Sequence, residues 1–424
     1  MASNPTRLVS VAAAAVLGAW AAVCPCPAAA QTADDLFRPD VLHEVRLRVH
    51  SRDWATLQAA YRENTYYPCE LTWDGHRVPD VAIRSRGAFT RSGVKPGLRV
   101  DFNRYVPGRR VVGQASLVLD NLLQDPSTMR EALATRVYAR LGLPAARESF
   151  ARLDVNGQYY GLYTIVEEIA EPFLDRVYGE SDGYLYEYHW LDYWYFTYPG
   201  AALEPYLRMF EPRTHLDEPV EAQAGPIEEM VRVVNDADDE SFEAEAGRLL
   251  ALDEVLAQVA IDRLLTNVDW FVGAWGVNNL YMYRSVRTGR SRFIPWDLDV
   301  SMLWTDLPVT ADLDSNVLTR RALAVPWLHE HYFATLAAAA ESLAEPVEAS
   351  PDGAQAFTWF EAQVDQVYAL VRDAILEDVL KPYSNEDFEA SVELLRHFAR
   401  ERPRFVRCEA ARALDPDTAP LRCR

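Results

Sequence analysis

Hydrophobic periodicity changes along this chain, and the change limits the folds that are open to it. Up to about Val166, apolar and polar residues alternate in short runs such as LHEVRLRVH (residues 42–50) and LRVDFNRY (98–105), which is typical of half-buried β-strands. Further on, apolar residues recur at helical spacing, as in LDEVLAQVAIDRLLTN (252–267). With 424 residues, of which 49% are apolar, the chain can bury one large core or two lobes. We therefore predict an α+β protein that opens on strands and continues mainly in helices.

Turn residues and helix caps mark the ends of several elements. Asp74-Gly75 and Asn156-Gly157 predict tight hairpins. Residues 51–64 are typical of a helix, and a clear helix is predicted from Asp125, its expected N-cap, to Leu141. Later helices are expected within residues 327–343, 357–380 and 385–414.

The polar residues that most suggest chemistry lie in the segment 267–299. In order, it contains an acid, a paired amide, a strand-like run, a turn, a second strand-like run and two acids: Asp269, Asn278 and Asn279, LYMY, Thr288-Gly289, RFIPW, Asp297 and Asp299. A hairpin that brings an upstream Asp, an Asn and a terminal Asp to one rim is how protein kinases hold magnesium and ATP. The alternative is that Asp269 and Asp297 only cap and solvate the ends of the hairpin, since Asp is common at turns.

A second candidate site is the loop AFTRSGVKPG (residues 88–97), between two expected strands. It combines the cations Arg91 and Lys95 with Gly93 and Gly97, and cations with exposed amides suit a phosphate group. The same composition is also found in solvent-exposed hairpin loops that bind nothing.

The N-terminus and the charge bear on where the protein works. Residues 1–30 are typical of a secretory signal peptide, with Arg7 before an apolar, Ala-rich run and small residues before Gln31. A retained membrane anchor is the alternative, but the run is short for a bilayer, and no later stretch is long enough. With 42 Lys+Arg against 63 Asp+Glu, the net charge is −21, so nucleic acid is an improbable partner.

Three cysteines remain if the leader is removed. Cys408 and Cys423 are near neighbours that could form a disulfide in an oxidising compartment, which would leave Cys69 free. No pair has the spacing of a zinc site.

Several long segments occur in an order that resembles the spore coat protein H (CotH) kinase family. The resemblance runs from about Arg84 to about Asp299, roughly half of the chain. The segments are SRGAFTRSGVKPGLRVDFNRY, LDNLLQDPSTMREALATRVYARLGLPAARESF, NGQYYGLYTIVEE, DGYLYEY, NNLYMYR and IPWDLD.

This resemblance implies an atypical protein-kinase-like fold of two lobes. Residues 34–170 would form a β-rich N-lobe with one helix, and residues 171–424 a mainly helical C-lobe that carries the catalytic segment. Glu167 and Glu168 would lie at the hinge between the lobes.

The resemblance also implies a secreted or cell-surface (or periplasmic) kinase that transfers the γ-phosphoryl group of ATP, with Mg²⁺ or Mn²⁺, to Ser or Thr of a surface or extracellular protein. Asp269 would orient the acceptor hydroxyl. The other roles fall into two groups, metal binding by Asn278 or Asn279 and Asp297, and nucleotide binding by Lys95, Arg99, Glu131 and Glu167. Within the second group, Arg99 is expected to be able to pair with Glu131.

Departures from the ordinary kinase pattern keep other functions open. The chain has no GxGxxG loop, VAIK or HRD motif, and Glu187 stands where members of the family often carry Lys. One alternative is a catalytically inactive surface or adhesion protein on a kinase fold. Another is a hydrolase with metal ligands Asp269, Asp297 and Asp299, which is less favoured because no His accompanies these acids.

Overall fold

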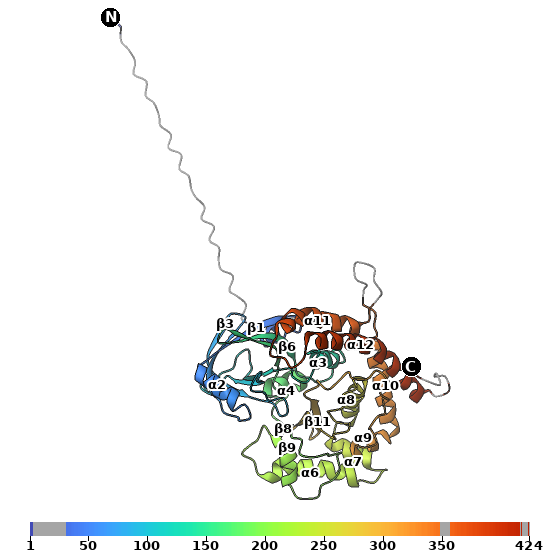
Figure 1. Ribbon diagram of the computed structural model, residues 1–424. Coiled ribbons are helices and arrows are strands. Elements are labelled where there is room, and N and C mark those ends of the chain that lie inside the picture. Colours follow the sequence, from blue (N-terminus) through green and yellow to red (C-terminus); the bar gives the residue numbers. More distant parts are fainter. Residues whose placement is uncertain (3–30, 348–356, 416, 418–422, 424) are drawn as a thin grey trace.

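The computed structural model describes residues 1–2, 31–347, 357–415, 417 and 423. The predicted signal peptide therefore lies almost wholly outside the described residues. The protein is a mixed α+β structure with a β-rich N-terminal region and a helical C-terminal region (Figure 1). Both predicted features of the fold class are confirmed.

A closed barrel of seven strands forms the N-terminal region, in the order β1-β2-β3-β4-β5-β7-β6. The strands are β1 (Leu42–Val49), β2 (Tyr67–Trp73), β3 (His76–Ser85), β4 (Leu98–Asp101), β5 (Ser116–Asp120), β6 (Glu148–Val155) and β7 (Gln158–Val166). Adjacent pairs are antiparallel except for β1 and β6, which pair in parallel and close the barrel. Alternate apolar side chains fill its interior, as the sequence pattern predicted.

Both predicted hairpins are present. Asp74-Gly75 joins β2 to β3 and Asn156-Gly157 joins β6 to β7, and all four residues have positive φ. Gly, Asn and Asp tolerate this conformation best, which is why these dipeptides were informative.

Three helices accompany the barrel; the sequence pattern predicted the second and the third, whereas the family resemblance implied one helix for residues 34–170. They are α1 (Ala33–Leu36), α2 (Ser51–Ala59) and α3 (Arg130–Arg140). The last begins later than predicted, because Asp125 does not cap it as the N-cap residue. Instead the Asp125 carboxylate accepts hydrogen bonds from the backbone N–H groups of Ser127, Met129 and Arg130, so it orders the turn that leads into the helix.

A smaller antiparallel sheet of four strands, in the order β11-β10-β8-β9, lies in the C-terminal region. Its strands are β8 (Tyr184–Tyr188), β9 (Phe210–Pro212), β10 (Leu280–Arg284) and β11 (Ser291–Pro295). The last two form the predicted hairpin around Gly289, and they support the candidate site.

The remaining helices cover this sheet and pack on one another. They are α4 (Glu171–Tyr178), α5 (Glu204–Met209), α6 (Val220–Asp236), α7 (Phe242–Leu249), α8 (Leu252–Leu264), α9 (Val317–Leu323), α10 (Pro326–Leu343), α11 (Trp359–Glu377) and α12 (Asn385–Leu414). In Figure 1, α11 and α12 run side by side, and α11 also packs against β7 of the barrel. Cys408 and Cys423 form the disulfide that their spacing allowed, and Cys69 is free and buried.

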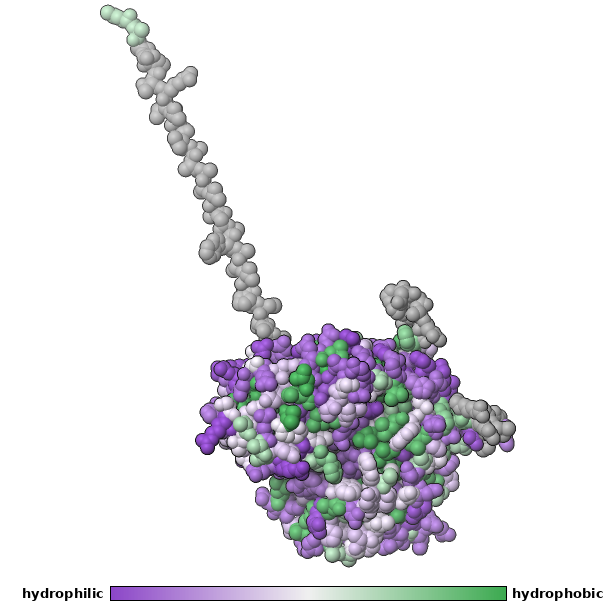
Figure 2. Space-filling view, viewed as in Figure 1, coloured by the Kyte–Doolittle hydropathy of each residue, from purple (hydrophilic) through white to green (hydrophobic). Residues whose placement is uncertain are grey.

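Hydrophilic residues predominate on the face shown in Figure 2, with smaller apolar areas between them. Among the described helices, none has a segment long and apolar enough to cross a bilayer.

Candidate functional site

The connection from α8 to β10 brings three of the predicted site residues into contact. The Asn278 side-chain amide donates a hydrogen bond to Oδ1 of Asp269 (2.7 Å), and the Asn279 amide donates to Oδ2 (2.9 Å). The three side chains are half-buried. Burial raises the pKa of Asp269, and the two amide bonds oppose this rise. Since each amide uses its nitrogen here, its carbonyl oxygen remains available to a ligand.

The end of β11 adds two more carboxylates. Asp297 has a φ of 57° and Asn279 a φ of 46°, a left-handed conformation that is uncommon outside Gly and often occurs at functional sites. The backbone also links them, because the N–H of Trp296 donates to the carbonyl of Asn279 (2.9 Å). Asp299 accepts a hydrogen bond from Gln124 (3.3 Å) at one oxygen, while its other oxygen is buried with no partner in the described part of the chain.

The raised pKa values of these acids indicate that their carboxylates are close enough to repel one another. Burial and then the charge of Asp120 raise the pKa of Asp297 to about 7, and Asp269 adds to the effect. Burial and the charge of Asp297 raise the pKa of Asp299 well above its usual range. Glu131 behaves similarly, since burial and nearby carboxylates, including Asp297, hold its pKa high. A group of acids that repel one another in this way is prepared to bind a cation.

The barrel contributes two residues that sequence reasoning missed. Asp120 ends β5, and Arg86, which directly follows β3, approaches it (Nη1 to Oδ2, 3.7 Å). The Arg86 guanidinium also lies over the ring of Trp296, with 5.6 Å to the centroid, and it lowers the pKa of Asp297. Asp120 is the last residue of its strand, Arg86 directly follows its strand, and Asp297 lies two residues beyond β11; this position near a strand end was the available signal.

Lys95 pairs with a carboxylate outside this group of acids. Its side chain is 1% exposed, and its ammonium forms an ion pair with Asp378 (2.7 Å), whose side chain is fully buried. It also lies over the ring of Tyr163. Burial lowers the pKa of Lys95, and the Asp378 carboxylate opposes this. The ammonium that was predicted to contact phosphate is thus engaged by a residue just beyond α11.

Arg99 forms an ion pair with Glu168 and a hydrogen bond with Ser116, both on the outside of the barrel. The expected pair between Arg99 and Glu131 is not formed. The reason is geometric, because Arg99 is on β4 beside Glu168, the second residue after β7, whereas Glu131 is in the first turn of α3 and lies among the carboxylates.

Glu167 is fully buried and accepts from two arginines, Arg147 (2.7 Å) and Arg176 (2.5 Å). Glu167 and Glu168 follow the end of β7 and have different partners, since Glu168 pairs with Arg99 rather than with Arg147 and Arg176. Of the two, Glu168 is the one on the face of Arg99.

The acid group fits a magnesium ion that arrives with a nucleotide better than a permanent metal site. Among the described residues, no three carboxylate, imidazole or thiolate side chains are arranged to hold a metal ion. Magnesium, however, is usually bound by one or two carboxylates, with phosphate and water as the other ligands. Asp297 and Asp299 could supply the two carboxylate ligands, and one oxygen of Asp299 has no partner among the described residues. The hydrolase alternative instead requires that protein side chains alone hold the metal ion.

Comparisons with known proteins agree with the resemblance seen in the sequence. The pattern of the family described as CotH kinase protein matches residues 83–406, which include the barrel strands from β4 onward, the acid group and most of the C-terminal helices. The chain is also similar to Inner spore coat protein H of Bacillus subtilis (strain 168), at 24% identity over 378 residues. That alignment covers 85% of this chain and 96% of the relative.

Proposed function

The chain belongs to the CotH kinase protein family, and from this premise we propose that it is an atypical kinase with a two-lobed architecture. It would transfer the γ-phosphoryl group of ATP to Ser or Thr of a protein at the cell surface or outside the cell. One observation carries the proposal. The Asn278 and Asn279 amides donate hydrogen bonds to Asp269, and the charge of Asp269 acts on Asp297, although these four residues are spread over 29 positions of the sequence.

Each of these residues has a role that its surroundings support. Magnesium, when bound, supplies positive charge that neutralises the phosphates. Asp297 and Asp299, with an amide oxygen of Asn278 or Asn279, would hold that ion. Asp269 would orient the acceptor hydroxyl and receive its proton, because the two amides fix its carboxylate and its raised pKa suits a general base.

The cations that face the nucleotide are assigned differently from the sequence prediction. We assign this role to Arg86, which lies 3.7 Å from Asp120 and lowers the pKa of Asp297, and to Arg99 beside Glu168. The role predicted for Lys95 stays a prediction, and its pair with Asp378 argues against it.

The inactive surface protein remains the second candidate, and two observations favour it. Lys95 is withdrawn into a buried ion pair. Glu131 has no ion pair among the described residues, so the cation-to-glutamate pair of active kinases is not formed.

Incubation of the purified mature chain with labelled ATP and Mg²⁺ or Mn²⁺, followed by mapping of phosphorylated residues, tests the proposal. We expect Asp269→Ala to keep nucleotide binding but to lose at least about a hundredfold in transfer, the scale of general-base catalysis. Asp297→Asn should also lose the rise in melting temperature on addition of ATP with metal.

Asp373→Asn is the matched control, because this aspartate is 90% exposed on α11, and it should behave as wild type. Nucleotide stabilisation without any transfer in the wild type would support the inactive candidate. Transfer that survives Asp269→Ala would refute the catalytic role of that residue.

A further inference from the structure

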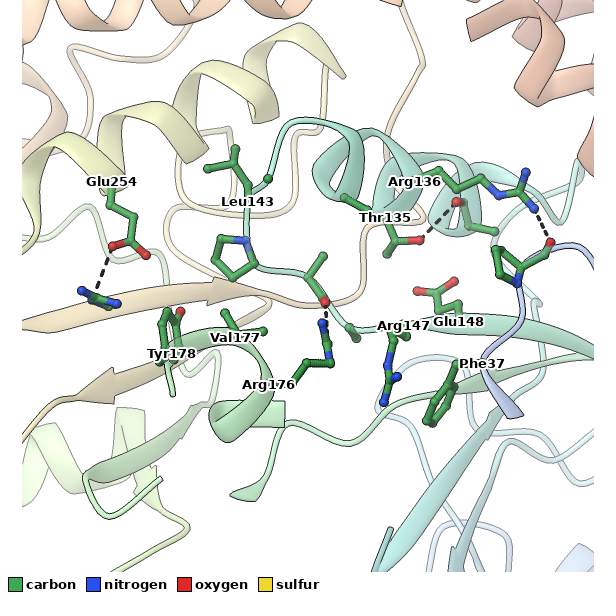
Figure 3. Close-up of a pocket in the computed structure, with 18 of the residues that line it drawn as sticks. Phe37, Thr135, Arg136, Leu143, Arg147, Glu148, Arg176, Val177, Tyr178 and Glu254 are labelled. Atoms are coloured by element: carbon green, nitrogen blue, oxygen red, sulfur yellow. Dashed lines mark hydrogen bonds and ion pairs between the residues drawn. The ribbon is translucent and has the colours of Figure 1, made fainter. Parts of the chain in front are cut away.

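A cavity of about 600 Å³ lies between α3, β6, α4 and α8, and shares no lining residue with the rim of Asp269 and Asp297 (Figure 3). Its volume is in the range of pockets that hold small organic ligands. Much of the wall is apolar and includes Leu143, Pro144 and Val177, and the aromatic rings of Phe37 and Phe150 line it as well.

Glu148 is an acidic residue of this cavity, and both of its carboxylate oxygens are buried without a hydrogen-bond partner among the described residues. It begins β6, and its side chain is more than nine-tenths buried. A carboxylate that is buried without a donor destabilises the folded state. Burial raises the pKa of Glu148 well above its usual range, and the charges of Asp120 and Asp297 add to the effect.

The arginines around the cavity are already engaged. Arg147 pairs with Asp34 and Glu167. Arg136 donates to the Gln363 side chain (2.9 Å) and to the Pro39 carbonyl, and forms no ion pair with Glu148. These cations therefore leave Glu148 as the unmatched charge, and they do not form an open site for an anion.

At the other end, the cavity has a different polar character. Figure 3 shows Glu254 and Tyr178 at one end and Glu148 at the other, with Leu143 and Val177 between them. Glu254 is paired with Arg292 (3.4 Å). The cavity thus offers an apolar, partly aromatic trough with one unpaired carboxylate at its end.

We propose that this cavity binds a small organic ammonium compound with an apolar, preferably aromatic, body. The ammonium donates hydrogen bonds to Glu148 and neutralises it, while the body packs on Leu143, Val177 and the ring of Phe150. Aromatic rings beside the carboxylate also favour a cation. The inference does not depend on phosphotransfer, because none of the residues assigned to that reaction lines the cavity.

Calorimetric titration of the mature chain with phenethylamine tests this site, with phenethyl alcohol and phenylacetate as neutral and anionic compounds of similar shape. We expect saturable binding of one amine per chain and at least about tenfold weaker binding of the other two compounds. Glu148→Gln keeps the shape of the side chain but removes its charge, and should weaken amine binding at least about tenfold.

Two further variants separate the cavity from other sites. Val177→Trp fills the trough without touching the carboxylate, and should also abolish binding. Glu44→Gln is the control, because Glu44 is 61% exposed on β1, and it should bind as wild type. Absence of saturable binding at millimolar amine, equal affinity of Glu148→Gln, or preference for phenylacetate would each overturn the proposal.

Discussion

Buried charged side chains have a large effect on the free energy of unfolding of this protein. Lys95 and Asp378 are 1% and 0% exposed, so each depends on the other for compensation of its charge. The Asp378 carboxylate also accepts hydrogen bonds from the N–H groups of Leu162, Leu380 and Lys381. The pair therefore joins the barrel to the chain that follows α11.

We predict that Lys95→Met destabilises the protein by about 3–5 kcal/mol, because it leaves a carboxylate buried without its cation. Adding Asp378→Asn should recover part of this loss, since both charges are then gone while the acceptor oxygen remains. Urea unfolding measures both effects, with the exposed Arg404→Met as the control. If Lys95 instead contacts phosphate, its replacement will weaken ATP binding and leave the free energy of unfolding nearly unchanged.

Asp262 predicts a dependence of stability on pH. It is completely buried in α8, and burial raises its pKa from 3.8 to about 7, although Arg263 beside it (3.0 Å) opposes this. Because the folded pKa is above the unfolded one, the folded state holds the proton more tightly. The resulting stability is complete below about pH 4 and is lost as the pH rises through about 7.

In Asp262→Asn this contribution is absent. Between about pH 5.5 and pH 8, the unfolding free energy of the wild type relative to the variant should fall by about 2 kcal/mol. Urea titrations at several pH values measure the difference, and Asp373→Asn should show no such trend. A difference that is constant with pH would mean that Asp262 is ionised throughout.

At the scale of elements, the connection between α8 and β10 determines the geometry of the candidate site. Gly276 has a φ of 73°, and a Cβ there would come closer to the Trp194 carbonyl oxygen than real Cβ atoms do. The next residue, Val277, donates its N–H to that same carbonyl (2.7 Å). Only one residue, Val277, separates Gly276 from Asn278 and its bond to Asp269.

Gly276→Ala should therefore shift this connection and reduce phosphotransfer at least about tenfold, as misplacement by about 1 Å does. Gly289→Ala is a close control, because Gly289 has a φ of 72° in the β10–β11 turn and open space around its Cα. It should cost about 1 kcal/mol of stability through its φ alone and leave transfer intact. Activity and urea unfolding are both measured, and equal effects of the two substitutions would contradict the argument.

At the scale of the whole molecule, local signals predicted the elements but not how they close. Most of the barrel strands, the three hairpins and the helices α8, α10, α11 and α12 could be predicted because each depends on neighbouring residues, whereas α9, β5 and β9 were not predicted. The parallel pairing of β1 with β6, which turns the strands into a barrel, joins segments that are more than 100 residues apart in the sequence. No local pattern encodes such a pairing.

The residues of the candidate site also differ in whether the local sequence could predict their association. Asp269, Asn278 and Asn279 could be grouped in advance because the short connection that leads into the β10–β11 hairpin carries them. Arg86 and Asp120 come from the barrel and meet Asp297 only through the tertiary fold. For the same reason the pairing of Arg99 could not be predicted, since alternation indicated its face but not that Glu168 lies there.

The closure of the barrel also determines how early in synthesis the N-terminal region can fold. When β1 leaves the ribosome, β6 has not yet been translated, so one edge of the growing sheet stays open and able to pair with other chains. Lys95 lacks its counter-ion for longer still, because Asp378 is 283 residues downstream in the sequence. The barrel therefore cannot complete its fold as it emerges from the ribosome. A chain that ends before Asp378 contains a buried Lys95 without its counter-ion.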